Sequence, residues 1–599
     1  MKKIELQFKK YRLYVIGILC IFIATYITGI HDIELPGVYF DAVYPDYLAA
    51  VGAFPGINNF TQITQHVGLP LLGNFYHGTF SAAVQFIVLK CVGHASVYTL
   101  RLTNLFYIAI IGAILFAVSY KLSRKWVCSL LPAFICVTSQ NALAHTRTQY
   151  FIMLPGVVFF LLSLSILFWN LLLNEGTKQS WFVAAGIFQG LAFYVYFSFL
   201  FLVPASLILI FRHESVHKRR ESTFCYIWSV VLGSILYFYG YLDSLLVNLF
   251  GFSTIAKILL ILGCVLITLV LCFPILVVLN PRFKHYKRNI FIIYMVVALM
   301  GVIAICCTII HYIGNEKFIA IKKMIVMSQN RNSGSRLLQY WNLLFQVLTN
   351  DCSQFVIFRE KLCDIGCGHA LIYGCLSLVA FIIYSNKKLK HQQTSDEIEI
   401  VVLYDLCMYV VIFYITSLPI VMGMQPQHLI VVYYIISLMS TMGLCYIVSI
   451  FFNKYIKMGL LIGLLIVGVI INIKNDSVFF KVLEKNGGQG SYSTAYNDFS
   501  KMAYEDENKD TTIYVFPQWN FYANFVYLTS NSCQAIRNAD IQIGNIQDKI
   551  NSGYIIVIVG TDQNVISDIS TQLHYKESKQ KSWKSLERDE VFVSLEISK

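Results

Sequence analysis

Charge is scarce in this chain of 599 residues. Only 13% of the residues are Asp, Glu, Lys or Arg, and 57% are hydrophobic, whereas a soluble protein carries about 25% charged residues. This scarcity excludes an ordinary soluble globular protein and indicates a membrane protein.

The sequence also lacks the local signatures of soluble enzymes. It has no glycine-rich loop that could cradle a phosphate, no His-Glu-x-x-His pair and no nucleophile elbow. Its net charge of +13 comes mainly from basic residues in short links between apolar runs, where membrane orientation signals lie. We therefore expect no nucleic-acid partner, and any chemistry must be built from side chains at the membrane.

A disulfide framework is absent as well. Most of the 16 cysteines lie inside apolar runs, where a thiol behaves as a small hydrophobic group. Cys352, Cys363 and Cys367 lie near His369 in a predicted loop, but Cys-x3-Cys-x-His is a weak zinc spacing. A disulfide or free thiols are the favoured interpretation of this group.

Apolar stretches of about 20 residues recur as far as residue 473, and each is long enough to cross a bilayer as a helix. The first, 13–30, follows a basic segment and precedes no cleavage site, so we expect a retained anchor with a cytoplasmic N-terminus. Basic links occur at 121–125, 212–220, 281–288, 386–390 and 453–457. All five face the cytoplasm if about thirteen helices span the membrane and the chain turns back at Tyr196. The sequence thus predicts a multi-pass α-helical protein of the cytoplasmic membrane.

Three segments outside the spans are expected on the side away from the cytoplasm. The first loop, 31–100, contains FSAAVQFIVLKCVG, and the middle loop, 314–368, contains SRLLQYWNLLFQVLTND; both patterns predict helices at the membrane surface. The tail contains the strand-like runs TTIYVFP, YIIVIVG and VFVSLEI between helix-length segments. We therefore predict a membrane domain, 1–473, and a small outer α/β domain, 474–599.

Two aspartates lie among tyrosines in the first loop, in PGVYFDAVYPDY. Partial desolvation at the membrane surface would raise the pKa of Asp41 and Asp46 and make either a competent general base; a solvated loop acid is the alternative. Tyr76 and His77 follow in PLLGNFYHGTF. The first loop is therefore the first place to look for a site.

Cations and amides supply further candidates. Arg101 and Arg147 lie at predicted outer ends of spans, against the usual inward bias of positive charge, and their forked donors suit a phosphate or an anionic headgroup. Arg336 belongs to a basic stretch of the middle loop. Gln427 and His428 lie at the outer end of a late span, within reach of a hydroxyl-rich or phosphorylated group. Snorkelling to lipid headgroups, a solvated charged face and a structural histidine are the corresponding alternatives.

The order of these motifs resembles that of the C-type polytopic glycosyltransferases (GT-C), in particular the bacterial relatives of protein O-mannosyltransferases and aminoarabinose transferases (glycosyltransferase family 39). One span precedes a large outer loop with PGVYFDAVYPDY, and PLLGNFYHGTF, VGHASVYTLRL and GIFQGLAFYVYFSFLFLVPA follow, so the resemblance covers most of 13–210. Asp41 stands at the place of the family's first-loop aspartate. Ala42, Gln149 and His428 depart from it, since relatives carry acidic residues at the first two places and an arginine at the third.

This resemblance implies transfer of a sugar, with inversion, from an undecaprenyl-phosphate or similar lipid-linked donor to a glycan, lipid or protein acceptor on the outer side. Asp41 would be the base, and the substrate-binding residues would be Asp46, Tyr76, His77, Arg101, Arg147, Arg336, Gln427 and His428. We predict no cofactor, although Asp41 with Asp46 or Glu34 could hold a divalent metal. The alternatives are a polysaccharide polymerase or ligase, and a lipid-linked oligosaccharide flippase or other transporter, whose path Asp243 and Asp405 would mark.

Overall fold

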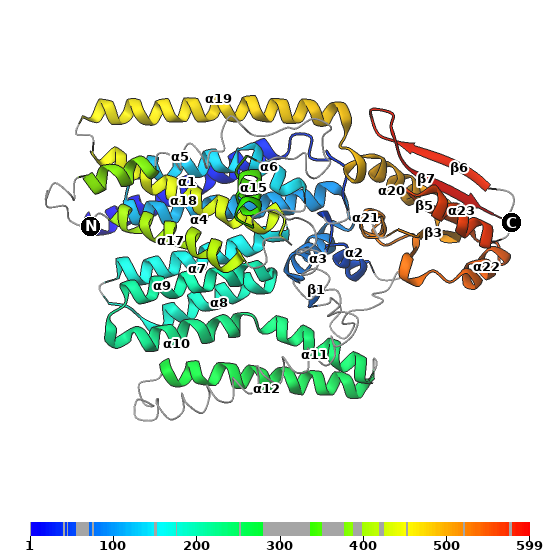
Figure 1. Ribbon diagram of the computed structural model, residues 1–599, viewed down its shortest axis with the longest axis horizontal. Helices are drawn as coiled ribbons and strands as arrows, with labels where there is room; N and C mark the ends of the chain where they lie inside the picture. Colours follow the sequence, from blue (N-terminus) through cyan, green and yellow to red (C-terminus); the bar gives the residue numbers. More distant parts are fainter. Residues whose placement is uncertain are drawn as a thin grey trace.

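A long helical bundle carries a smaller α/β domain at one end in the computed structural model (Figure 1). The structure describes residues 2–39, 42–44, 46–54, 71–74, 77–148, 152–174, 176–250, 253–279, 336–349, 377–386, 398–418, 424–450, 453–518, 521–573 and 578–598.

The bundle consists of helices that run roughly side by side (Figure 1). Its members are α1 (Lys2–Gly29), α4 (Val97–Ser123), α5 (Trp126–Val137), α6 (Gln140–Arg147), α7 (Leu154–Phe168), α8 (Gln179–Val195), α9 (Val203–His213), α10 (Val216–Gly233), α11 (Ile235–Phe250), α12 (Thr254–Leu279), α17 (Ile398–Ser417), α18 (Ile430–Ile450) and α19 (Lys454–Asn486). Eight helices of the described residues are long and apolar enough to cross a membrane, or nine if the bent pair of α5 and α6 is one span. The predicted multi-pass helical fold is confirmed. The predicted number of about thirteen spans rests partly on segments outside the described residues.

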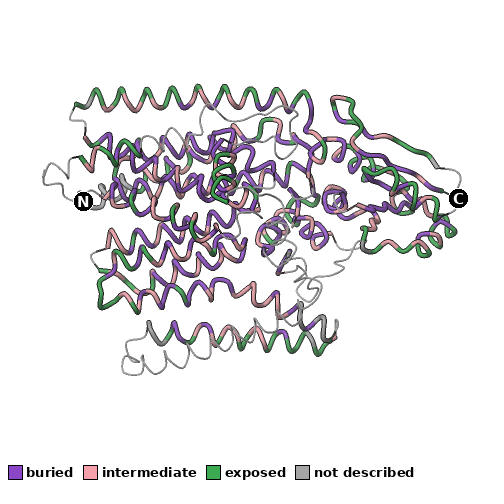
Figure 2. Tube along the Cα trace, viewed as in Figure 1, coloured by how far each residue is buried: buried purple, intermediate pink, exposed green. Residues whose placement is uncertain are grey.

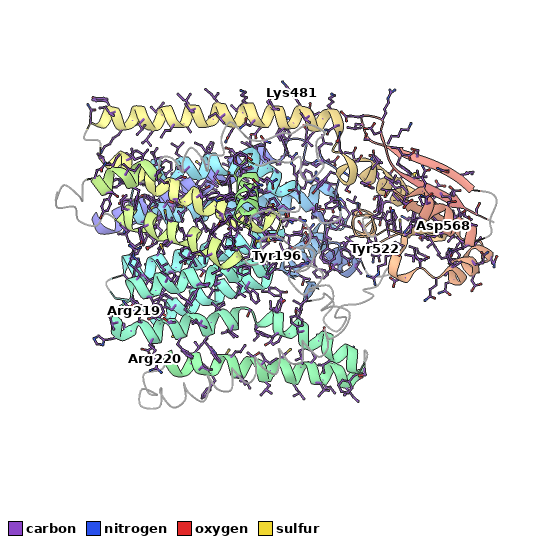
Figure 3. All side chains as sticks on the ribbon, in the orientation of Figure 1. Tyr196, Arg219, Arg220, Lys481, Tyr522 and Asp568 are labelled. Carbon is purple, nitrogen blue, oxygen red and sulfur yellow. The ribbon has the colours of Figure 1, made fainter. Side chains whose placement is uncertain are left out.

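The two ends of the bundle differ in what they carry. The N-terminus lies at the end opposite the C-terminal domain, and Arg219 and Arg220 of a predicted inward link lie at the same end of the bundle as the N-terminus (Figures 1 and 3). Tyr196 lies toward the other end, between α8 and the short turn η4 (Phe197–Leu202), so the predicted break there is confirmed. The first loop and the C-terminal domain share this second end, which we call the domain end. Its position outside the cytoplasm stays a prediction.

Helices α8 and α10 touch through their backbones. A Cβ atom built on Gly190 would lie 2.1 Å from the carbonyl oxygen of Val230, and one built on Gly233 would lie 2.2 Å from that of Ile187. Small residues allow such close approach between membrane helices, whose association depends on packing because lipid tails are as apolar as leucine. This contact holds the Tyr196 segment at a fixed place in the bundle.

We expect Gly190→Ala to destabilise the protein by about 1–3 kcal/mol, because the added methyl group must push two backbones apart. The matched control is Gly459→Ala on α19, where an added Cβ meets nothing within 4 Å. Thermal or denaturant unfolding in detergent micelles measures the difference. Equal losses in the two variants would show that the contact between α8 and α10 is not tight.

The C-terminal domain is a five-stranded sheet between two helical layers, in the strand order β4-β3-β5-β7-β6. Strands β3, β4 and β5 are parallel, whereas β7 runs antiparallel to β5 and β6. The strands are β3 (Thr512–Phe516), β4 (Gln534–Arg537), β5 (Ile555–Gly560), β6 (Ser578–Lys584) and β7 (Glu590–Ile597), and the helices are α20 (Ala495–Glu505), α21 (Tyr522–Leu528), α22 (Ile543–Asn551) and α23 (Gln563–Gln572). The three predicted strand runs are β3, β5 and β7, and the predicted α/β domain is confirmed.

The side chains of β3 point alternately into two hydrophobic cores, one on each face of the sheet. Tyr514 and Phe516 pack with aromatic residues of α20 and α21, whereas Ile513 and Val515 pack with isoleucines of α22 and α23. Successive side chains of a strand point to opposite faces, so each face of the sheet is covered by its own helices. Figure 2 shows that β3 is buried whereas the edge strand β6 is mostly exposed, and it also shows how exposed α19 is, as expected of a helix that faces lipid. Helix α19 continues to Asn486, past the predicted end of the last span near residue 473.

Short elements complete the domain end. The first loop forms α2 (Tyr47–Ala53), β1 (Leu72–Asn74), β2 (His77–Gly78) and α3 (Phe80–Val92), and the later segments form α15 (Arg336–Thr349) and the turn η8 (Pro426–Leu429). Helices therefore form at both predicted surface segments, in α3 and α15. Helix α15 is seen almost end-on while the bundle helices lie across the view, so it runs across their direction (Figure 1).

Candidate active site

The first loop and the C-terminal domain form one wall at the domain end. Ala523 and Tyr527 of α21 are buried in one core with residues of α2, α3 and the start of α4. Asn524 donates a hydrogen bond to the carbonyl oxygen of Val38 at 3.1 Å, and Gln85 of α3 donates one to the Tyr527 hydroxyl. The domain therefore fixes the conformation of the first loop.

Asp46 is enclosed in this wall. Its residue is 2% exposed, and burial raises its pKa to about 7, against the opposing effect of a hydrogen bond from Ser81. Its Oδ1 atom is buried and has no hydrogen-bond partner. The raised pKa predicted for a first-loop aspartate is therefore present at Asp46. However, the carboxyl group is fully rather than partly buried, because α21 closes over the loop, so a substrate does not reach it in this conformation.

Four aromatic rings from separate segments meet at the domain end, and we call Tyr44, His77, Tyr196 and His428 the histidine–tyrosine cluster. The ring centres of Tyr44 and His77 lie 5.4 Å apart, those of His77 and Tyr196 lie 6.2 Å apart with parallel planes, and those of Tyr196 and His428 lie 5.4 Å apart. The cluster joins the first loop, the break after α8 and η8. It therefore brings together two histidines that the sequence analysis singled out separately.

Both histidines of the cluster are neutral. The backbone N–H of Gln425 donates to Nδ1 of His428 at 2.9 Å, so the ring proton is on Nε2, which donates to the Tyr196 hydroxyl at 2.8 Å. Nδ1 of His77 donates to the carbonyl oxygen of Gly78 at 3.1 Å, and burial lowers the pKa of His77 to about 4. The cluster is therefore a neutral aromatic group whose ring faces suit an uncharged, hydroxyl-rich ligand, although His77 and Tyr196 are buried and their polar atoms are paired in this conformation.

Arg101 and Arg147 hold the turn that follows α1. Both are 2% exposed. Arg101 donates to the carbonyl oxygens of Ile33 and Pro36, each at 2.6 Å, and Arg147 donates to those of Gly29, His31, Asp32 and Leu35 at 2.5–3.1 Å. This geometry gives both arginines a positioning role. Their binding to phosphate stays a prediction, which these contacts do not favour.

The remaining predicted residues are spread over the domain end. Asp41 and Tyr76 lie outside the described residues. Arg336 is exposed at the start of α15, which packs against η8. Gln427 of η8 donates from its amide to the side-chain oxygen of Gln425 at 2.9 Å. Arg336 is therefore the predicted cation that is exposed on a helix next to His428.

Sequence reasoning did not place Tyr44 and Tyr196 in a site. Tyr44 was visible only as one of several tyrosines around the aspartates, and Tyr196 only as the point where a long apolar run must turn. The useful signal was the break itself, because a polar aromatic residue at the end of a span can pack against the loops that meet there. Within the described part of the chain, the one group of three His, Asp or Glu side chains that could share a metal ion lies elsewhere, at the end of α19.

No protein-family profile matches the chain, and no curated protein matches it. Several solved structures are similar. One is the oligosaccharyltransferase of Archaeoglobus fulgidus in complex with zinc and sulfate, with 14% identity over 95% of this chain and 68% of that one and a TM-score of 0.48. Another is AglB of the same organism with an inhibitory peptide and a dolichol-phosphate, with 14% identity over 92% of this chain and 70% of that one and a TM-score of 0.45.

A third similar structure is ArnT of Cupriavidus metallidurans bound to undecaprenyl phosphate, with 10% identity over 97% of both chains and a TM-score of 0.37. At these identities and TM-scores, the likeness does not establish an activity. The chain is thus similar to an archaeal oligosaccharyltransferase and to ArnT.

Proposed function

We propose that this chain is a membrane glycosyltransferase that moves a sugar from a polyprenyl-phosphate-linked donor to a glycan, lipid or protein acceptor at the domain end, with inversion. The observation that carries the proposal is the histidine–tyrosine cluster beside a first loop whose carboxyl group at Asp46 has a pKa of about 7. A neutral aromatic surface suits a sugar ring, and the first loop can hold an ionisable carboxyl group shielded from water.

In this reaction Asp41 takes the proton of an acceptor hydroxyl. The hydroxyl oxygen attacks the anomeric carbon from the face opposite the lipid phosphate, the bond from that carbon to the phosphate oxygen breaks, and the configuration inverts. Asp41 follows the described stretch that ends at Tyr39, whose ring packs on Tyr492 at 4.9 Å between centres. This packing places the described residue nearest to Asp41 on its N-terminal side against the start of the C-terminal domain.

The departing lipid phosphate needs a cation as its charge develops. Arg101 and Arg147 already donate to backbone carbonyl oxygens, so Arg336 is the better candidate. Arg336 begins α15, which packs against η8. Helix α15 also has an exposed apolar face formed by Leu337, Trp341 and Phe345. Such a face can lie against the lipid chain while Arg336 pairs with the phosphate.

Asp405 gives no support to a transport function. Asp405, which would mark a path, is 2% exposed and pairs with Arg212 and His213 at 2.8 Å each. A buried carboxylate that pairs with an arginine and also contacts a histidine is a structural feature rather than an open binding site. No observation favours a polymerase or ligase over the transferase.

The test is transfer of labelled sugar from a panel of polyprenyl-phosphate sugars in proteoliposomes. We expect Asp41→Asn to lower kcat at least about 100-fold, because the neutral amide cannot accept the proton. Asp568→Asn, on the exposed face of α23, is the matched control and should transfer normally (Figure 3). Equal transfer by Asp41→Asn would exclude Asp41 as the base, and movement of labelled lipid across the bilayer without transfer would support a transporter.

A further inference from the structure

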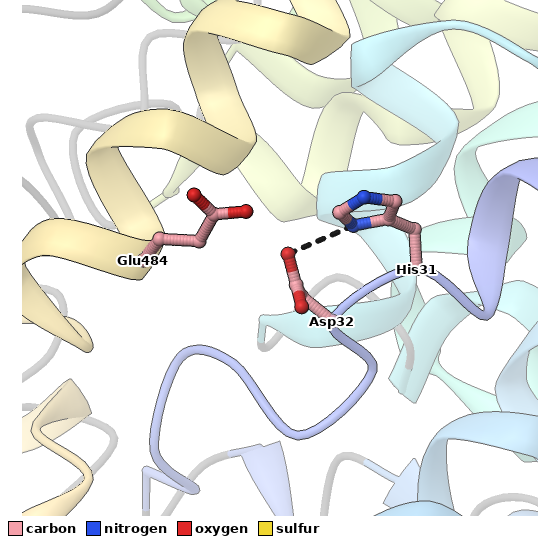
Figure 4. A group of neighbouring side chains, drawn as sticks. All are labelled: His31, Asp32 and Glu484. Atoms are coloured by element: carbon pink, nitrogen blue, oxygen red, sulfur yellow. Dashed lines mark ion pairs between the residues drawn. The ribbon is translucent and has the colours of Figure 1, made fainter.

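Three side chains, none of them from the histidine–tyrosine cluster, meet where α19 ends (Figure 4). His31 and Asp32 belong to the turn after α1, and Glu484 belongs to the last turn of α19. One ligand atom of each, a ring nitrogen or a carboxylate oxygen, lies within 4.8 Å of the other two. Segments far apart in the sequence thus bring an imidazole and two carboxylates to one point.

The contact between His31 and Asp32 is unusual. Nδ1 of His31 lies 2.8 Å from Oδ2 of Asp32, yet this oxygen is buried and has no hydrogen-bond partner, so the short distance is not an aligned hydrogen bond. The two atoms form an ion pair where the imidazole is protonated, and with a neutral imidazole their lone pairs can turn toward a shared third atom. Neighbouring ligands of a tetrahedral zinc ion, with bonds of about 2.1 Å, lie about 3.4 Å apart, so the two atoms would move apart by roughly 0.6 Å when an ion binds.

The surroundings hold the two residues of the turn in place. Arg147 donates to the backbone carbonyl oxygens of His31 at 2.5 Å and Asp32 at 3.0 Å. The His31 ring also packs on Phe480, with 4.5 Å between ring centres, and Phe480 lies one helical turn before Glu484 on the same face of α19. Supporting contacts of this kind orient metal ligands.

We propose that His31, Asp32 and Glu484 bind one divalent transition-metal ion, with Zn²⁺ as the best match. An imidazole with two carboxylates suits zinc rather than Mg²⁺ or Ca²⁺, which prefer oxygen ligands alone. The two carboxylates supply the negative charge that a dication neutralises, and the exposure of His31 and Glu484 leaves room for a water molecule as the fourth ligand. The ion braces the turn after α1 against the helix that leads into the C-terminal domain. This proposal is independent of the proposed transfer reaction.

The test uses the full-length protein in detergent, stripped with EDTA, dialysed, and titrated with Zn²⁺ alone. We expect one Zn²⁺ per chain, and at least tenfold weaker binding by both His31→Ala and Glu484→Gln. The matched controls His94→Ala and Glu505→Gln change exposed residues outside the group and should bind as the wild type does. In the wild type, Co²⁺ should give visible absorption bands that His31→Ala alters.

Binding without a defined stoichiometry, or wild-type affinity in Glu484→Gln, would overturn the proposal. Glu484→Gln replaces one exposed carboxylate by an amide of the same size, so its metal-free melting temperature should equal that of the wild type. Because no readout involves sugar transfer, failure of this proposal and failure of the proposed function are distinguishable.

Discussion

Replacing Arg147 by alanine should destabilise the protein by about 3–5 kcal/mol. The guanidinium group of Arg147 is buried and holds four backbone carbonyl oxygens of the turn after α1. Hydrogen bonds to a charged donor each contribute about 1.5–3 kcal/mol, and the carbonyl groups lose their donor, but removing the buried charge recovers its desolvation cost and offsets much of this sum. Contact with the Phe480 ring at 5.0 Å is lost as well. Denaturant unfolding in detergent micelles measures the change.

Two further variants make this result specific. Arg12→Ala removes an exposed arginine from α1 and should change stability by less than about 0.5 kcal/mol. Arg147→Lys should recover only part of the loss, because an ammonium group cannot reproduce the planar fork that spans four acceptors. If Arg147→Ala were as stable as Arg12→Ala, the turn would be held by other contacts, and the positioning role assigned to Arg147 would be wrong.

Hydropathy and alternation were enough to predict the architecture. A span needs about 20 apolar residues whatever its neighbours, and a strand between two helical layers shows in a run such as TTIYVFP, because both of its faces are buried. The break at Tyr196 was predictable for the same reason, since the apolar run is too long for one helix and too short for two ordinary spans. These features depend on local sequence, so one sequence suffices to find them.

The site was only partly predictable. Arg101 and Arg147 stood out as misplaced cations, but their partners are backbone carbonyl groups, which every residue has and no sequence pattern reveals. Asp46 was a candidate, yet its full burial depends on Tyr527 and its neighbours, contributed by a domain that lies far away in the sequence. His77 and His428 were both candidates, but the sequence did not predict that they share one cluster, because Tyr196 connects them only in the folded bundle.

Burial of Asp46 makes the free energy of unfolding depend on pH. An aspartate in the unfolded chain titrates near 3.8, whereas burial raises the pKa of Asp46 in the folded state to about 7. The folded state therefore binds the proton of Asp46 more tightly than the unfolded chain does. The stabilisation that comes from this proton is fully present below pH 4 and is lost as the pH rises to about 7. Keeping the ionised group buried above this pH costs about 4 kcal/mol.

Asp46→Asn should therefore be more stable than the wild type at pH 8, by up to about 4 kcal/mol, and similar to it at pH 4. Stability should be measured from pH 4 to 8 for both proteins and subtracted, because His77, whose pKa is lowered to about 4, titrates equally in both and drops out of the difference. Asp568→Asn, an exposed substitution, should follow the wild type at every pH. A constant difference between wild type and Asp46→Asn across this range would mean that the carboxyl group of Asp46 reaches water in the folded protein, since only contact with solvent would return its pKa to the ordinary value.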